Sequence, residues 1–143
     1  MLSVDYVHLP FGDTPRFVKA APFRAVVVIE QDVSEEWRDQ VSEWLVRSGC
    51  LYMCAWGRDC SKWDDSVDHA NLRDFDYGEI PDDRFVMTTW HADEPISEAF
   101  WFAGHCADHP TVPLPRLLIV DVAQFGRGEK ILAAFEQARL GEG

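Results

Sequence analysis

The chain has 143 residues, which fits one domain whose core buries roughly 68–70% of the surface of the unfolded chain. Hydrophobic residues make up 47% of the sequence, with six Trp and nine Phe, and this excludes an intrinsically disordered protein. The net charge of −12 excludes non-specific nucleic-acid binding, because no basic surface is available to displace phosphate counterions.

The same sequence gives no sign of contact with a membrane. No apolar run approaches the roughly 20 residues that a membrane-spanning helix needs. The first residues lack the basic segment and following apolar stretch of a signal peptide. We therefore expect a cytoplasmic protein whose four Cys residues are reduced.

The elements begin with an irregular, proline-containing arm at residues 1–22 that packs on a single domain of residues 23–143, with a candidate strand at 4–8. A continuous run of β-branched residues then predicts a strand over 23–30. Because the run does not alternate with polar residues, this strand is expected to be buried on both faces, as in a parallel sheet.

A helix follows, with Asp32 or Ser34 as its N-cap and a stop at Gly49. Its apolar residues recur at helical spacing from Trp37 to Leu45, which marks one buried face. Strands and helices then alternate along the rest of the chain. The further strands are predicted at 51–56, 85–90 and 117–120, and the further helices at about 61–73, from 95 onward, and at 128–140.

This alternation predicts an α/β fold of the flavodoxin or Rossmann-like class. We expect one three-layer domain, with a mostly parallel four-stranded sheet, helices on both faces and residues 4–8 as a possible fifth strand. A strand order of 2-1-3-4 is favoured for the four main strands. The ligand crevice would then lie between the ends of the first and third strands.

Residues able to do chemistry follow each of the four apolar runs. In a parallel sheet these strand ends share one edge, so we interpret them as one candidate site. The candidates are His91 and Asp93 as catalytic acid–base groups, Trp56, Arg58, Asp59 and Trp90 as ligand-binding residues, and Glu30, Asp32 and Asp121 as ligands for Mg²⁺ or Mn²⁺. The alternative is that these carboxylates cap helices and that the tryptophans pack in the core.

Three familiar motifs are absent from the sequence. There is no glycine-rich dinucleotide loop after the first strand, no Walker-type phosphate loop and no G-x-S-x-G nucleophile elbow. The spacing of Cys50, Cys54 and Cys60 does not match a standard zinc site. These absences weaken assignments to the nucleotide, hydrolase and zinc classes.

An acidic cluster lies between the second and third predicted strands. Asp64 and Asp68 are one helical turn apart and would share a face, with Asp65 beside them. Carboxylates at this spacing suit a divalent cation. The alternative is a solvated helix face whose acids are favoured near the helix N-terminus.

Three segments resemble an uncharacterised bacterial family of small Rossmann-like α/β proteins that is known as a domain of unknown function. They are Ala55–Cys60, Trp63–Asp68 and Thr88–His91. The resemblance covers roughly residues 23–135. It implies a bacterial source and a Rossmann-like domain, and it implies no activity and no catalytic residues.

These observations favour a small acidic binding module of immunity or antitoxin type with a basic protein as its partner. The alternative is a metal-assisted enzyme or ligand sensor that uses the strand-end site. Its ligand would be a small anionic molecule, phosphate-like or nucleotide-like. A third hypothesis is a structural subunit that docks through its Trp-rich surface.

Overall fold

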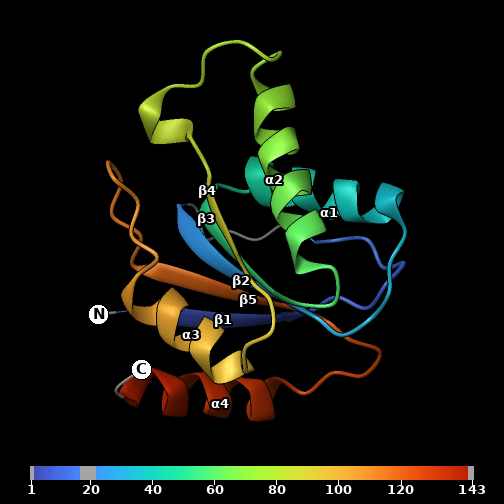
Figure 1. Ribbon diagram of the computed structural model, residues 1–143, viewed down its shortest axis with the longest axis vertical. Helices are drawn as coiled ribbons and strands as arrows, with labels where there is room; N and C mark the ends of the chain where they lie inside the picture. Colours follow the sequence, from blue (N-terminus) through green and yellow to red (C-terminus); the bar gives the residue numbers. More distant parts are fainter. Residues whose placement is uncertain (1, 17–21, 142–143) are drawn as a thin grey trace.

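The computed structural model describes residues 2–16 and 22–141. Within those residues the chain forms one sheet of five parallel strands flanked by four helices, which confirms the predicted α/β class (Figure 1). The strands are β1 (Ser3–His8), β2 (Phe23–Ile29), β3 (Cys50–Gly57), β4 (Met87–His91) and β5 (Arg116–Val122). The helices are α1 (Glu35–Arg47), α2 (Cys60–Asp74), α3 (Ile96–His105) and α4 (Gly128–Leu140), with a short 3-10 turn, η1 (Asp82–Arg84).

The strands lie in the order β1-β5-β2-β3-β4, and every neighbouring pair is parallel. The predicted order of 2-1-3-4 is wrong, because the four predicted strands lie in the order 3-2-1-4. The chain steps from β2 to β3 to β4 in one direction and then returns to place β5 on the other side of β2. The topological switch point, where ligands bind in open α/β sheets, is therefore between β2 and β5.

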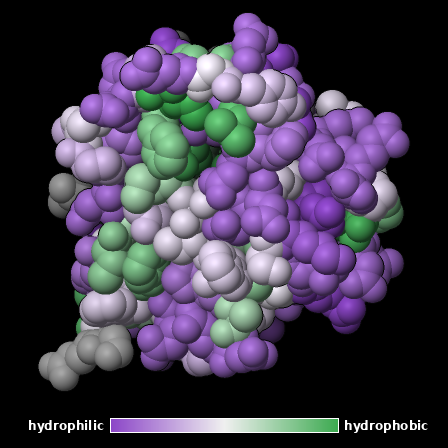
Figure 2. Space-filling model, turned by 45° about the horizontal axis from the view of Figure 1, so that its top comes forward, coloured by the Kyte–Doolittle hydropathy of each residue, from purple (hydrophilic) through white to green (hydrophobic). Residues whose placement is uncertain are grey.

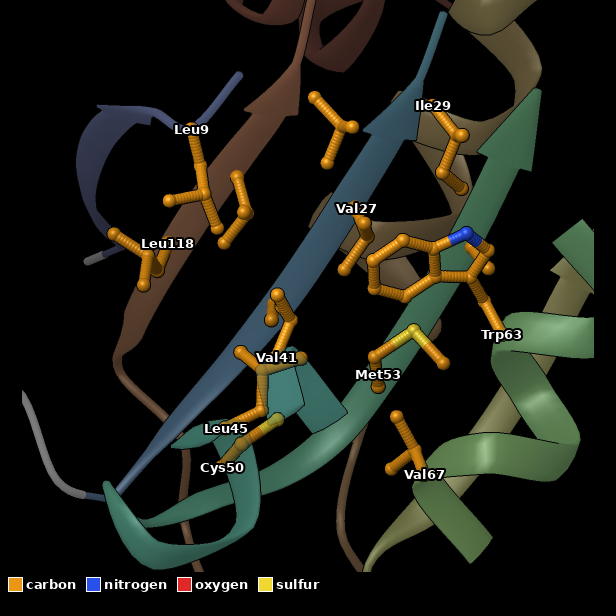
Figure 3. Close-up of a cluster of buried hydrophobic side chains, with 14 of the residues drawn as sticks. Leu9, Val27, Ile29, Val41, Leu45, Cys50, Met53, Trp63, Val67 and Leu118 are labelled. Atoms are coloured by element: carbon orange, nitrogen blue, oxygen red, sulfur yellow. The ribbon is translucent and has the colours of Figure 1, made fainter. Parts of the chain in front are cut away.

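The two directions of travel place helices on both faces of the sheet. Parallel crossovers are right-handed, so α1 and α2 cover one face, and α3 and α4 cover the other (Figure 1). Strand β2 has buried residues along its whole length, as its uninterrupted apolar run predicts. On the α1 and α2 face, Trp63 packs over Val27, Ile29 and Met53 (Figure 3).

The candidate strand at residues 4–8 is present as β1, which pairs with β5 and forms one edge of the sheet. Part of the predicted arm, residue 1 and residues 17–21, lies outside the described residues. The other edge of the sheet is β4, and its only strand partner among the described residues is β3.

Gly57 fixes the path of the chain as it leaves β3. Its φ of +107° lies in the left-handed region, and a Cβ at this position would overlap the carbonyl oxygen of Ile29. The same carbonyl accepts a 2.9 Å hydrogen bond from the backbone N–H of Arg58. This close approach holds the start of α2 against the end of β2.

Candidate functional site

The parallel sheet brings the predicted strand-end residues to one edge. Glu30 follows β2, Arg58 follows β3, His91 ends β4, and Asp121 lies near the end of β5. The strand order places β2 beside β5, with Asp121 opposite Val28, so Glu30 and Asp121 lie near each other across the switch point, where both contact Arg127. The contacts that each side chain makes show which of them are available to a ligand.

Asp121 is fully buried and is held by two residues that the sequence reading did not select. Arg127 binds both carboxylate oxygens: its Nε donates to Oδ2 and its Nη2 to Oδ1, each at 3.0 Å. The hydroxyl of Tyr6 on β1 donates to Oδ2 at 2.6 Å and accepts a 3.2 Å hydrogen bond from the backbone N–H of Arg127. The guanidinium also forms an ion pair with Glu30.

Electrostatics reinforces this cluster. Burial, together with the hydrogen bond to Asp121, raises the pKa of Tyr6 to about 12. Hydrogen bonding to Asp121 and the nearby charge of Glu30 hold the pKa of Arg127 above its usual value. The switch point is therefore filled by a network in which one arginine is shared between two carboxylates. We infer that this network stabilises the packing of β1, β5, the end of β2 and the start of α4 against one another.

An open pocket of about 440 Å³ lies beside this network, lined by Ile29, Glu30, Trp56, Gly57 and Arg58. Arg58 makes a 3.3 Å contact with Asp32, and both side chains are mostly exposed. The indole N–H of Trp56 donates to the backbone carbonyl of Glu94 at 2.8 Å. Trp56 is thus fixed at the wall of the pocket. A ligand-binding role for Trp56, Arg58 and Asp59 stays a prediction.

His91 is engaged on both ring nitrogens. Its Nδ1 lies 2.7 Å from a carboxylate oxygen of Glu94, and its Nε2 lies 3.0 Å from the hydroxyl of Thr89. The ring packs on Phe102 with 4.9 Å between ring centroids, and the side chain is 10% exposed. The carboxylate that meets His91 is therefore Glu94, whereas Asp93 is exposed on a turn. The catalytic role of His91 and Asp93 stays a prediction.

The three predicted metal ligands are not gathered around one point. Glu30 and Asp121 bind Arg127, and Asp32 meets Arg58. Across residues 2–16 and 22–141, no group of three or more His, Cys, Asp and Glu side chains is arranged to hold a metal ion.

A different region combines apolar and charged groups that have few partners. Seven large hydrophobic side chains are exposed in the described part of the chain, and four of them lie between α2 and the end of β4. These four are Leu72, Tyr77, Phe85 and Trp90. The segment around η1 lies at the top of Figure 1, and Figure 2 turns it forward. Figure 2 shows a mostly hydrophilic face with apolar residues gathered in a few patches.

Two carboxylates face the edge strand from α2. The hydroxyl of Thr88 on β4 donates to Asp68 at 2.8 Å. Asp64 is 6% exposed, and one of its carboxylate oxygens is buried with no hydrogen-bond partner among the described residues. Burial and repulsion from neighbouring acids raise the pKa of both carboxyl groups. A positive group placed here would remove this electrostatic penalty.

The charge of the protein is concentrated in the same region. Residues 64–94 carry ten Asp and Glu but only two Arg, so this stretch of 31 residues has a net charge of −8 out of −12. We name the surface formed by residues 64–94 the acidic edge; it comprises most of α2, the segment 75–86, β4 and the turn that follows β4. The acidic residues can be seen in the sequence. That they lie beside an edge strand follows only from the strand order, which places β4 at the border of the sheet.

Comparison with known proteins places the chain in a family. Residues 4–138 match the family described as "Domain of unknown function (DUF7684)", and the chain belongs to this family. The resemblance drawn from the sequence segments is confirmed, over a longer stretch than expected. No curated protein and no solved structure matches the chain. No helix in the described residues has the length and apolar character required to cross a membrane.

Proposed function

We propose that this DUF7684 chain is an acidic binding module whose partner is a basic protein, and that it binds through the acidic edge. The observation that carries the proposal is the coincidence of charge and exposed apolar side chains in one region. Two-thirds of the net negative charge and four of the seven exposed large hydrophobic side chains lie between residues 64 and 94.

Each of the two properties has a defined role in such an interface. Exposed carboxylates steer a basic partner into contact and disfavour acidic partners. Exposed aromatic side chains such as Phe85 and Trp90 supply the buried contact area that holds a complex together. A protein that covers a basic partner in the bacterial cytoplasm, as immunity proteins and antitoxins do, fits this combination.

The strand-end site supports an enzyme less well. Its two most central carboxylates neutralise Arg127, and both ring nitrogens of His91 have partners within the protein. A general base must lie within hydrogen-bond reach of the proton that it takes from substrate, whereas these side chains are directed to partners inside the protein. We therefore place function at the acidic edge.

A selection from a random peptide display library tests the proposal without knowledge of the partner. We expect the full chain to select 12-residue peptides enriched in Lys and Arg. Their affinity should fall when the salt concentration rises, because exposed charges are screened beyond roughly 8–10 Å. The triple variant Asp68→Asn, Asp82→Asn, Asp83→Asn should bind the selected peptides roughly tenfold or more weakly, a loss of about 1.4 kcal/mol.

The matched control removes three charges on the opposite side of the molecule, with Asp5→Asn, Glu129→Gln and Glu136→Gln. These side chains lie on β1 and α4 and are exposed. Their replacement should leave binding nearly unchanged. Selection of peptides without basic enrichment, failure to select any peptide, or equal weakening by both triple variants contradicts the proposal.

A further inference from the structure

The open strand β4 has the hydrogen-bonding groups needed to recruit another strand. Among the described residues it pairs only with β3, through the register from Tyr52 and Met87 to Trp56 and His91. Alternate residues of a strand direct their N–H and C=O groups to the same side, so part of the backbone of β4 faces outward. An exposed row of this kind is a template for pairing with another chain.

An apolar groove runs beside the start of this strand. It has a volume of about 300 Å³, and Leu72, Ile80, Phe85 and Met87 supply its apolar walls. Trp90 lies toward the other end of β4 and is 54% exposed. Apolar contacts are thus available at both ends of the strand edge, and a peptide that follows β4 reaches both.

The charge beside the same strand selects the kind of chain that fits. Asp68 accepts the hydrogen bond from Thr88 in the middle of β4, and the neighbouring Asp64 has a buried carboxylate oxygen without a partner in the described residues. A Lys or Arg side chain brought in on an added strand would meet the exposed Asp68, and its charge would also act on Asp64, which is buried one helical turn away. Opposite charges brought together across an interface favour the pairing of the two chains.

A second copy of this chain is a poor occupant of the edge. Pairing two β4 strands would bring together two 64–94 segments that each carry a net charge of −8, and like charges brought together across an interface oppose binding. A basic partner turns the same charge into an attraction. The charge therefore selects a foreign strand over self-association.

We propose that an extended basic segment of the partner protein adds to β4 as a sixth strand of the sheet. An apolar side chain of that segment enters the groove at Leu72 and Phe85, and a Lys or Arg lies beside Asp64 and Asp68. This inference rests on the proposed function and specifies its binding mode. Affinity comes from main-chain hydrogen bonds, and specificity comes from the groove and the carboxylates.

The first test uses the basic peptides selected by the display experiment, with N-methyl groups on alternate residues. One set of alternate amides would face β4 and the other would face solvent. Methylation of the facing set should weaken binding roughly 100-fold or more, because each lost donor breaks an interstrand hydrogen bond. Methylation of the other set should change affinity less than about threefold. Equal affinity of both methylated forms and the parent peptide overturns strand addition.

Hydrogen exchange measured residue by residue by NMR gives an independent readout. With saturating peptide, amide protection should rise at alternate residues of Met87–His91, because the remaining amides of β4 already face β3. The amides of β1 should not change and serve as the internal control. Binding without this alternating protection means that the peptide docks by side chains only, and the strand proposal is then wrong.

The groove and the carboxylates are tested by substitution. Phe85→Ser and Asp64→Asn should each weaken the selected peptides roughly tenfold or more. Phe125→Ser is the matched control, since Phe125 is 74% exposed and follows β5 on a different part of the molecule. If basic peptides bind but these variants behave like the control, the binding mode fails and the binding function stands. If no basic peptide is selected, both fail.

Discussion

The two border strands of the sheet differ in how they are protected. On β1, two polar side chains are bound into the domain: Tyr6 donates to Asp121, and the ring Nε2 of His8 donates to the carbonyl of Ala123 at 2.7 Å. Helix α4 lies against this strand. On β4, Thr88 meets an acidic helix face and Trp90 is exposed. Each border strand has one strand partner and a helix packed against it. We call the β1 border closed because these polar contacts are made within the domain, and the β4 border open because exposed apolar and acidic side chains line it.

The difference shows that charge at a sheet border has two uses. At β1 a buried carboxylate is neutralised inside the chain by Arg127. At β4 the carboxylates of Asp64 and Asp68 have no cation within ion-pair distance in the described part of the protein. The first arrangement stabilises the fold. The second leaves carboxylates without a counter-charge, which a basic partner would supply. The same negative charge opposes pairing between two copies of the chain.

Removing the guanidinium at the closed border should have the largest effect on stability. Arg127→Met leaves the carboxylate of Asp121 buried without its counter-charge, and we expect the free energy of unfolding to fall by about 3–5 kcal/mol. Urea denaturation measures this change. The control Arg58→Met breaks an exposed arginine–carboxylate contact and should lose no more than about 1 kcal/mol. Similar losses in the two variants would show that the Asp121 network does not secure the β1 border.

Tyr6→Phe sharpens the comparison because it removes one hydroxyl from that border. The loss of the 2.6 Å hydrogen bond to buried Asp121 should lower the free energy of unfolding by about 1–3 kcal/mol at pH 8. The pKa of Tyr6 is raised from 10.0 to about 12 by burial and by Asp121. The folded state therefore retains the phenolic proton more tightly than the unfolded state.

This pKa shift gives the tyrosine variant a second, pH-dependent signature. The stability that comes from keeping Tyr6 protonated is fully present below pH 10 and is lost as the pH rises toward 12. The gap in unfolding free energy between the wild-type chain and Tyr6→Phe should narrow over this interval. Denaturation curves at pH 8, 10 and 11.5 measure it. A gap that stays constant contradicts the assigned role of the hydroxyl.

A substitution of an apolar residue by lysine at the β4 border should have the smallest effect on stability. Trp90→Lys replaces a side chain that is 54% exposed, and we expect the free energy of unfolding to change by less than about 0.5 kcal/mol. Val4→Lys on β1 is the counterpart, and it should lose about 1 kcal/mol or more because Val4 packs on the core beneath α4. Thermal unfolding of both variants compares the two borders, and equal losses would remove the distinction.

The positions of the strands along the chain were predicted more accurately from the sequence than the order of the strands in the sheet. The run from Ala25 to Ile29 indicated a strand buried on both faces because a parallel sheet leaves no polar face, and β2 is buried throughout. The order of the strands was wrong because the hydrophobic period of a crossover helix does not encode which side of the sheet the next strand joins. That single choice moved the switch point from the β2–β4 pair to the β2–β5 pair.

The same limit explains which site residues were found. Glu30 and Asp121 were selected because each follows an apolar run, and the pairing of β2 with β5 brings both to Arg127. Tyr6 and Arg127 were missed because they lie 121 residues apart and meet only when β1 joins β5. The acid run at 64–94 was visible as composition, but its value as a binding surface depends on β4 being a border strand.

The pairing of β1 with β5 has a consequence for the order of events during synthesis. Residues 3–8 leave the ribosome before the other strands of the sheet, and their partners, residues 116–122, emerge after all the other strands. β2 and β3 can pair much earlier, since they are joined by a single helix. The nascent chain therefore carries β1 without its strand partner until β5 has emerged, and formation of this pairing between distant segments is expected to be a late folding step.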